Sequence, residues 1–374
     1  MSRNLVYHSV RPENEQVTYT ENDQIDFILT FEGRKMIPSS LRIEGDVMIV
    51  PDKNTPTTIN NNDFYQLDRQ AGAHSLFDSW STELQTKGII ESISGDYPRY
   101  VKMFSQANRG VDDYCVADMV CELRSPNDYG ASLYTKQSNK DDTNIDNANG
   151  IDFSIKPMIA VNKIQGGNIS FNRTGYIKMT TVLSRNTCVN GCARTSADTY
   201  GYVIRNLKAK FLSVPEDNKN SQLVVSNVFA LKSAITSNFA NISSKVPATC
   251  SGVSISFLKK SNEHQNTSNP YATNVPPDLR EVQFLFNDNT QNLITYVISK
   301  RNDMQEKYIR SLGGSMNNEL TMTNQGMDDG FGVGVTFDDL VDLSNQKFNA
   351  QINSGIDNSN EYLIYMFFHG LMKL

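Results

Sequence analysis

The sequence predicts an all-β protein of the sandwich or barrel class with one or two short helices. Apolar and polar residues alternate with a period of two along the whole chain, and turn residues separate about fourteen to sixteen such stretches. Asn supplies about 40 of the 374 residues, and Asn competes with the helix backbone while favouring caps and turns. Many strands with few helices are typical of a sandwich or a barrel, not of an alternating α/β enzyme.

The strand candidates follow one another along both halves of the chain. Residues 331–337 alternate most regularly, with apolar side chains on one face and Gly332 and Gly334 on the other. In residues 41–49 the alternation continues across Gly45, where we expect a turn or a bulge. A period of two favours a strand with one face buried. The same period occurs in residues 25–31, 207–211, 253–257, 282–286 and 294–298.

Two stretches have the spacing of an amphipathic helix. Residues 302–313 place Met304, Tyr308 and Leu312 on one face, and a Gly-Gly pair ends the pattern. A helix is therefore predicted there, because glycine favours the C-terminal cap. Residues 227–242 also have helical spacing, but they are rich in Ser, Thr and Asn. Helix and strand both stay open for that stretch.

Charge and hydropathy exclude several classes of protein. The longest apolar run, Tyr362–Met372, is too short to cross a bilayer as a helix. No apolar stretch of signal-peptide length follows the first residues, so we expect no secretion by that route. The formal net charge of -6 gives no sign of the basic surface that a dedicated nucleic-acid binder carries. Five Cys in a chain of this length favour reduced thiols over a disulfide framework.

The chain is expected to divide into a short arm and two β-rich modules. Residues 1–16 show no periodicity, and we expect an N-terminal arm that orders only against a neighbour or an inner layer. The polar stretch 214–220 follows a strong strand and marks a boundary. A first sandwich is therefore expected in residues 17–215 and a second β-rich domain in residues 216–374. Long polar stretches, which are expected to be loops, occupy residues 136–150 and 259–274.

No group of side chains has the spacing that catalysis or metal binding requires. The nucleophile elbow, the P-loop and the His-Glu-x-x-His pattern are absent. We therefore expect no catalytic residue, no cofactor, no metal ligand set and no enzyme activity. Gly330, Gly332 and Gly334 lie inside a strand pattern, which favours close packing of one strand face over phosphate binding. Asp142–Asp146 resembles a calcium loop but lacks its glycine and closing acid, so only a looser cation site stays open.

The four histidines give no functional pattern. His8 and His264 lie in polar contexts and are expected to be solvated. His369 lies in an apolar run, so we expect a histidine at the edge of the core whose ring is satisfied by the backbone. His74 could pair with any carboxylate, but nothing in the sequence places one nearby.

Two cysteines lie close together in the sequence. Cys188 and Cys192 flank Asn190-Gly191, a pair of residues that is typical of a hairpin tip. We expect a hairpin with free thiols there. Half of a zinc site and a disulfide across the hairpin are the alternatives.

Five stretches together carry a resemblance to a known family. They are Phe31–Val47, His74–Trp80, Glu91–Tyr100, Phe153–Pro157 and Ile169–Ile177. In pattern they resemble the jelly-roll capsid proteins of the adenovirus-related lineage of DNA viruses. The resemblance is closest to the minor capsid or penton proteins of virophages and polinton-like viruses, with the double jelly-roll major capsid proteins as the near alternative. It implies a jelly-roll β-sandwich in the first module and a possible second jelly roll in the second.

The resemblance implies a structural virion protein in an icosahedral capsid shell, as a penton or minor subunit or as a major subunit. The implied partners are copies of the chain in a pentamer or a trimer and other capsid proteins. The inner membrane or the genome would be reached through the arm, where Arg3 and Arg11 lie. No small-molecule substrate is implied. The implied location is the virion, with assembly in the host cytoplasm.

A receptor- or carbohydrate-binding spike or fibre is the alternative function. That role needs an exposed aromatic platform beside a carboxylate. Trp80 is the only Trp and Asp78 lies near it, but Trp80 belongs to a stretch with a core pattern. A β-rich enzyme is the third class, and the absence of a catalytic motif argues against it.

Overall fold

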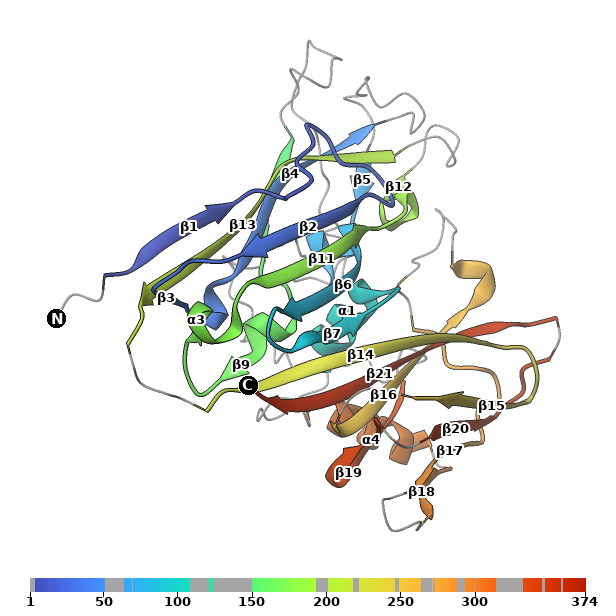
Figure 1. Ribbon diagram of the computed structural model, residues 1–374. Coiled ribbons are helices and arrows are strands. Elements are labelled where there is room, and N and C mark those ends of the chain that lie inside the picture. Colours follow the sequence, from blue (N-terminus) through green and yellow to red (C-terminus); the bar gives the residue numbers. More distant parts are fainter. Residues whose placement is uncertain are drawn as a thin grey trace. The chain divides into compact units, whose positions relative to one another are not determined.

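The chain folds into two units built of antiparallel strands (Figure 1). Unit 1 comprises Met1–Ser92, Tyr114–Leu223 and Gln265–Pro270, and unit 2 comprises Ile93–Asp113, Val224–His264 and Tyr271–Leu374. The predicted all-β class is confirmed. The computed structural model describes residues 4–50, 64–68, 70–107, 121–123, 150–192, 201–217, 222–245, 249–263, 271, 273–287, 293–299, 301–313, 332–344, 347–357 and 359–374.

Unit 1 is a sandwich of two sheets. Its eight principal strands are β1 (Val6–Val10), β2 (Gln24–Leu29), β4 (Arg42–Val50), β6 (Phe77–Leu84), β7 (Gly88–Ile93), β8 (Ile151–Ile155), β11 (Ile177–Leu183) and β13 (Gly201–Pro215). One sheet has the order β1, β13, β4, β8, and the other has the order β2, β11, β6, β7. The shorter elements are β3 (Arg34–Met36), β5 (Phe64–Gln66), β9 (Ile164–Gln165), β10 (Ile169–Ser170), β12 (Asn190–Cys192) and α3 (Phe171–Thr174).

The strand order of unit 1 is that of a jelly roll. Counted along the chain, the first, eighth, third and sixth strands form one sheet. The second, seventh, fourth and fifth strands form the other. Eight strands in two sheets, connected as two Greek keys, define the jelly roll. The core lies between the sheets. There the ring of Phe77 lies 5.5 Å from that of Trp80, which is also in β6, and 6.2 Å from that of Phe153 in β8.

Unit 2 repeats the same strand order. Its strands are β14 (Val224–Ile235), β15 (Phe239–Ser244), β16 (Thr249–Lys259), β17 (Glu281–Asn287), β18 (Leu293–Ile298), β19 (Val333–Asp342), β20 (Phe348–Asn353) and β21 (Tyr362–Lys373). One sheet runs β14, β21, β16, β19 and the other runs β15, β20, β17, β18. The second module is therefore a second jelly roll. The stretch 227–242, for which helix and strand were both open, forms parts of β14 and β15.

One long helix follows the fifth principal strand of each jelly roll. Helix α1 (Tyr97–Ala107) follows β7, and α4 (Arg301–Gly313) follows β18. The predicted helix at 302–313 is confirmed by α4. Helix α1 is absent from the sequence prediction, although Pro98 in its first turn is a start signal. No described helix has the length and apolar character needed to cross a bilayer.

Strand β21 is buried on both faces. Phe368 points to the other sheet and packs edge-on against Phe348 of β20 at 5.2 Å. On the opposite face, Phe367 contacts Tyr100 of α1 at 5.5 Å, and Tyr365 lies 4.3 Å from the guanidinium of Arg99. A strand covered on both sides reads as a continuous apolar run rather than an alternating one. This is the physical reason for the apolar stretch Tyr362–Met372.

Gly334 of β19 and Gly332, which directly precedes that strand, let the helix α4 approach the sheet closely. A Cβ atom on Gly332 would overlap the carbonyl oxygen of Ile255 and the ring of Tyr308. A Cβ atom on Gly334 would overlap the side chain of Ser311. The prediction that these glycines serve close packing of one strand face is confirmed for Gly332 and Gly334, while Gly330 lies outside the described residues.

The expectation for the N-terminal residues is wrong for Val6–Val10. These residues form β1, which pairs with Ala209–Ser213 of β13 in the same chain. His8 is half-buried rather than solvated, since it lies 4.0 Å from the Phe31 ring and stacks on Phe211 at 4.9 Å. Its Nε2 atom is 2.6 Å from the hydroxyl of Ser213. No side chain of β1 is fully buried, so its sequence shows no alternation and the pattern missed this strand.

The pairing of β1 is expected to weaken in mild acid. Burial and the neighbouring Arg34 lower the pKa of His8 from its ordinary value of 6.5. His8 therefore takes up a proton more readily when β1 is detached than when it is paired. The pairing of β1 has its full stability above pH 6.5 and loses stability as the pH drops below that value. Hydrogen exchange of the Val6–Val10 amides, corrected for the intrinsic rate, is expected to be faster at about pH 5.5 than at about pH 7.5. His8→Phe keeps a ring and removes the proton, so an unchanged pH dependence in that variant would contradict the assignment.

Candidate functional site

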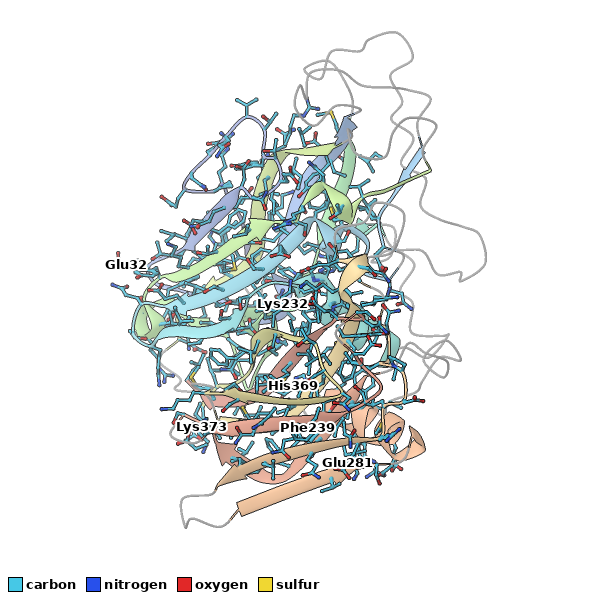
Figure 2. All side chains as sticks on the ribbon, turned by 90° about the vertical axis from the view of Figure 1, so that its right-hand side faces the viewer. Glu32, Lys232, Phe239, Glu281, His369 and Lys373 are labelled. Carbon is cyan, nitrogen blue, oxygen red and sulfur yellow. The ribbon has the colours of Figure 1, made fainter. Side chains whose placement is uncertain are left out.

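The histidines named from the sequence are structural where the structure describes them. His369 is buried in unit 2 (Figure 2), and its Nε2 atom lies 2.7 Å from the hydroxyl of Ser254. A serine therefore takes the place that was expected for a backbone group. His74 is buried, with Nε2 at 3.4 Å from a carboxylate oxygen of Glu122. That carboxylate lies 48 positions away in the sequence, so no local signal indicated it. His264 lies outside the described residues.

The cysteines form neither the expected hairpin nor a metal site within the described residues. Asn190–Cys192 is strand β12, paired with β5, so these residues are not a hairpin tip. Cys188 and Cys250 are buried free thiols, and burial raises the pKa of both, that of Cys250 to about 12. Thiols of this kind react poorly, because the thiolate is the nucleophile. The described part of the chain holds no group of three or more metal-ligating side chains. Asp142–Asp146 lies outside it.

A carbohydrate platform on Trp80 is excluded by its burial. Trp80 is only 1% exposed, and its ring packs against Phe77 in the core of unit 1. An aromatic ring binds a sugar only when its face is open to the ligand. The observation removes the one Trp on which the spike or fibre alternative depends.

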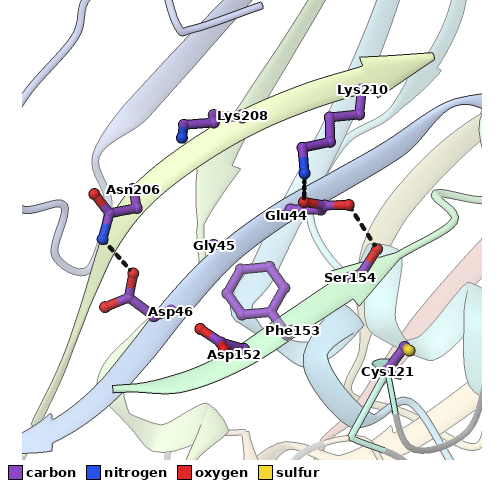
Figure 3. Close-up of a pocket in the computed structure, with 10 residues that line it drawn as sticks. All are labelled: Glu44, Gly45, Asp46, Cys121, Asp152, Phe153, Ser154, Asn206, Lys208 and Lys210. Atoms are coloured by element: carbon purple, nitrogen blue, oxygen red, sulfur yellow. Dashed lines mark hydrogen bonds and ion pairs between the residues drawn. The ribbon is translucent and has the colours of Figure 1, made fainter. Parts of the chain in front are cut away.

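Two hollows lie on the outer face of the β1–β13–β4–β8 sheet of unit 1, and Figure 3 shows the residues that line one of them. In β13 the buried residues alternate with half-buried lysines, so Ala209 and Phe211 point to the core while Lys208 and Lys210 point outward. We call this outer surface the charged face. It is defined by Tyr7, Arg42, Glu44, Asp152, Ser154, Lys208 and Lys210.

A hollow of about 520 Å³ lies on the charged face over β4 and β8. Lys210 forms an ion pair with Glu44, which also accepts a hydrogen bond from the Ser154 hydroxyl at 3.4 Å. The pKa of Lys210 is raised, chiefly by its hydrogen bond to Glu44. Three carboxylates and two lysines line the hollow, which leaves it slightly acidic. They are Glu44, Asp46, Asp152, Lys208 and Lys210.

A β-bulge shapes the end of this hollow. The register between β13 and β4 shifts between Arg205 and Lys208, and Asn206 there has a positive φ of 54°. The bulge turns two side chains toward Asp46, with Arg205 Nε at 3.1 Å and Asn206 Nδ2 at 2.7 Å from its carboxylate oxygens. The bulge expected near Gly45 is therefore present, but the extra residues belong to the facing strand β13.

A second hollow of about 660 Å³ adjoins the first and shares Asn206 and Lys208 with it. It lies between the bulge and the segment that follows β1. Val17 at its rim is 81% exposed, and Arg11 forms an exposed ion pair with Glu15 at 2.8 Å. Three cations and one carboxylate line it, so this hollow is basic. They are Arg11, Arg205, Lys208 and Glu15.

Two charges of the charged face are not neutralised within the described part of the chain. The side chains of Lys208 and Asp152 form no ion pair or hydrogen bond there, and they have opposite signs. In the hollow over β4 and β8 the Ser154 hydroxyl donates to Glu44 at 3.4 Å, and that carboxylate is itself held in the ion pair with Lys210. A broad polar surface with both signs of charge is suited to contact with another macromolecule.

No protein-family model and no curated protein sequence matches the chain. Among solved structures, the Faustovirus major capsid protein aligns over 100% of this chain and 90% of its own, with a TM-score of 0.58 and 9% identity. The chain has the double jelly-roll fold. A structure of the Sputnik virophage aligns over 99% and 86%, with a TM-score of 0.49 and 11% identity. The mavirus major capsid protein aligns over 98% and 90%, with a TM-score of 0.48 and 8% identity.

The double jelly roll is the alternative that the sequence resemblance left open for residues 216–374. The five stretches that carry the resemblance all lie in the first module. In the second module, strand β21 is covered on both faces and reads as one apolar run, whereas residues 331–337 alternate regularly.

Proposed function

We propose that the protein is a structural subunit of an icosahedral capsid shell and that it holds the major position on the facets. The observation that carries this proposal is the tandem repeat of one jelly roll, with the same strand order in each unit and a helix that follows the fifth strand of each along the chain. The fold shared with the Faustovirus major capsid protein over the full chain supports it. A capsid subunit of this kind would be located in the virion.

The tandem repeat favours the major subunit over a penton. Three copies of a chain with two similar units bring six similar units into one ring, which fits between six neighbours. Closed rings of this kind need head-to-tail contacts that close by rotation. A subunit at a five-fold vertex requires only one such unit per chain. A trimer is therefore the proposed building block, and copies of this chain and other capsid proteins are its partners.

A non-enzymatic role agrees with the side-chain chemistry of the described residues. The histidines there are engaged by Ser254, Glu122 and Ser213, and the buried thiols have raised pKa values. Among the described residues, the charged face of unit 1 presents accessible polar side chains. A surface of this kind stays soluble before assembly and forms hydrogen bonds and ion pairs with neighbours afterwards.

Mass measurement of the purified chain tests the proposed position. Size-exclusion chromatography with light scattering is expected to give a species of about three times 41.9 kDa. Electron microscopy of that species is expected to show six similar lobes around a ring. A stable monomer at micromolar concentration would contradict the proposal, and a pentamer would support the penton position in its place.

A further inference from the structure

The two jelly rolls differ in what covers one of their sheets. In unit 2 the outer face of the β14–β21–β16–β19 sheet is covered by α1 and α4, through contacts such as Arg99 with Tyr365 and Ser311 with Ser254. The equivalent sheet of unit 1 is β1–β13–β4–β8. Among the described residues no helix covers its outer face, and that surface is the charged face with its two hollows.

The charged face is divided into an acidic and a basic part. The hollow over β4 and β8 contains Asp152, and the adjoining hollow over the bulge of β13 contains Arg11 and Arg205. Lys208 lies opposite Glu44 of β4, and Asp152 lies opposite Asp46, two residues further along the same strand. The two charges without an ion-pair partner in the described part of the chain are thus two strands apart.

We propose that the charged face binds the charged face of a second copy of this chain, with two-fold symmetry. The two-fold axis lies in the contact plane, midway between Lys208 and Asp152, and runs at right angles to the line that joins them. Rotation about this axis brings each Lys208 against Asp152 of the other copy. The contact then contains two identical ion pairs, as an isologous interface requires. The basic hollow of each copy faces the acidic hollow of the other.

This inference rests on the proposed function, in which the contact joins neighbouring trimers in the shell. A second copy fits better than a nucleic acid does, because Glu44, Asp46 and Asp152 would repel phosphates. Tyr7, which is 59% exposed and lies 5.8 Å from the Lys210 ammonium, adds an aromatic group at the β1 side of the face. Tyrosine is enriched in protein contacts, where its ring is apolar and its hydroxyl can hydrogen-bond.

Charge reversal with rescue tests the contact. Sedimentation velocity of the full chain is expected to show trimers at about 500 mM NaCl and larger species at about 50 mM NaCl, because salt screens ion pairs at a surface. Lys208→Glu is expected to weaken the association of trimers at low salt at least about thirty-fold, since two like-charge contacts replace two attractive ones. Asp152→Lys is expected to do the same. The double variant Lys208→Glu/Asp152→Lys restores both pairs and the original net charge, so association is expected to return.

Lys347→Glu is the matched control. Lys347 is exposed in unit 2, and its substitution changes the net charge by the same amount as Lys208→Glu does. Trimers of this variant are therefore expected to associate as strongly as those of the unchanged protein. Trimers that do not associate at low salt, or a double variant that stays as weak as the single ones, would overturn the inference while leaving the proposed function intact. Loss of the trimer in the unchanged protein would instead contradict the proposed function.

Discussion

Arg99→Met is expected to lower the free energy of unfolding of unit 2 by about 3–5 kcal/mol, the range for breaking a buried ion pair. Arg99 is fully buried, its Nε atom lies 2.8 Å from a carboxylate oxygen of Asp96, and its guanidinium covers the Tyr365 ring. Burial opposes the charged form, but Asp96 and the nearby tyrosines outweigh it and keep the pKa of Arg99 raised. Met has a similar volume, so the loss reports the charge and not a cavity.

The measurement is hydrogen exchange of the β16 and β21 amides at increasing concentrations of a chemical denaturant. Two jelly rolls need not unfold in one step, so a single global midpoint would not isolate unit 2. Arg310 is the matched control, because it lies on α4 with 71% of its side chain exposed and pairs only with the exposed Glu306 among the described residues. Arg310→Met is expected to change the unfolding free energy by less than about 0.5 kcal/mol. Equal effects of the two substitutions would show that the buried pair contributes nothing.

Gly332→Ala is expected to cost unit 2 about 2–3 kcal/mol, at the upper end for overpacking. The added methyl group would overlap the backbone carbonyl of Ile255 and the ring of Tyr308. A backbone carbonyl in the middle of a sheet cannot rotate away. Strand β19 or helix α4 must therefore shift, and exchange of the amides between β16 and β19 is expected to accelerate in the same denaturation series.

Gly334→Ala provides the comparison for that result. Its added methyl group would overlap the Ser311 side chain, which a second substitution removes. Ser311→Gly is therefore expected to recover part of the stability lost in Gly334→Ala, and to recover none in Gly332→Ala. Rescue of both variants would mean that the packing of α4, rather than the sheet backbone, limits the space at both glycines.

The elements that sequence reasoning predicted correctly are those with a local cause. The helix at 302–313 has its apolar face and its glycine stop within one stretch of chain, and α4 confirms it. The alternation in 207–211 corresponds to a strand with one inward face, and that in 331–337 corresponds to β19, whose glycine face lies under α4. Helix α1 was missed because the short stretch 97–107 lies between strands and has only Pro98 as a start signal.

The wrong expectations concern residues whose environment is distant in the sequence. His8 was expected to be solvated, but Phe211 and Ser213 come from the far end of the first jelly roll. The partner of His74 is a carboxylate 48 positions away. Asn190-Gly191 has the composition of a turn, yet it pairs with β5 as a strand. Local composition carries no information about such partners.

Sequence alone determined that this protein is all-β and where several of its strands lie. These properties follow from the period of the side chains, which each stretch of chain carries by itself. Only the tertiary structure decided that β1 joins β13, that both modules have one strand order, and that no described helix covers the charged face of unit 1. Strand pairing depends on backbone hydrogen bonds between distant residues, and backbone groups are the same in every residue except proline.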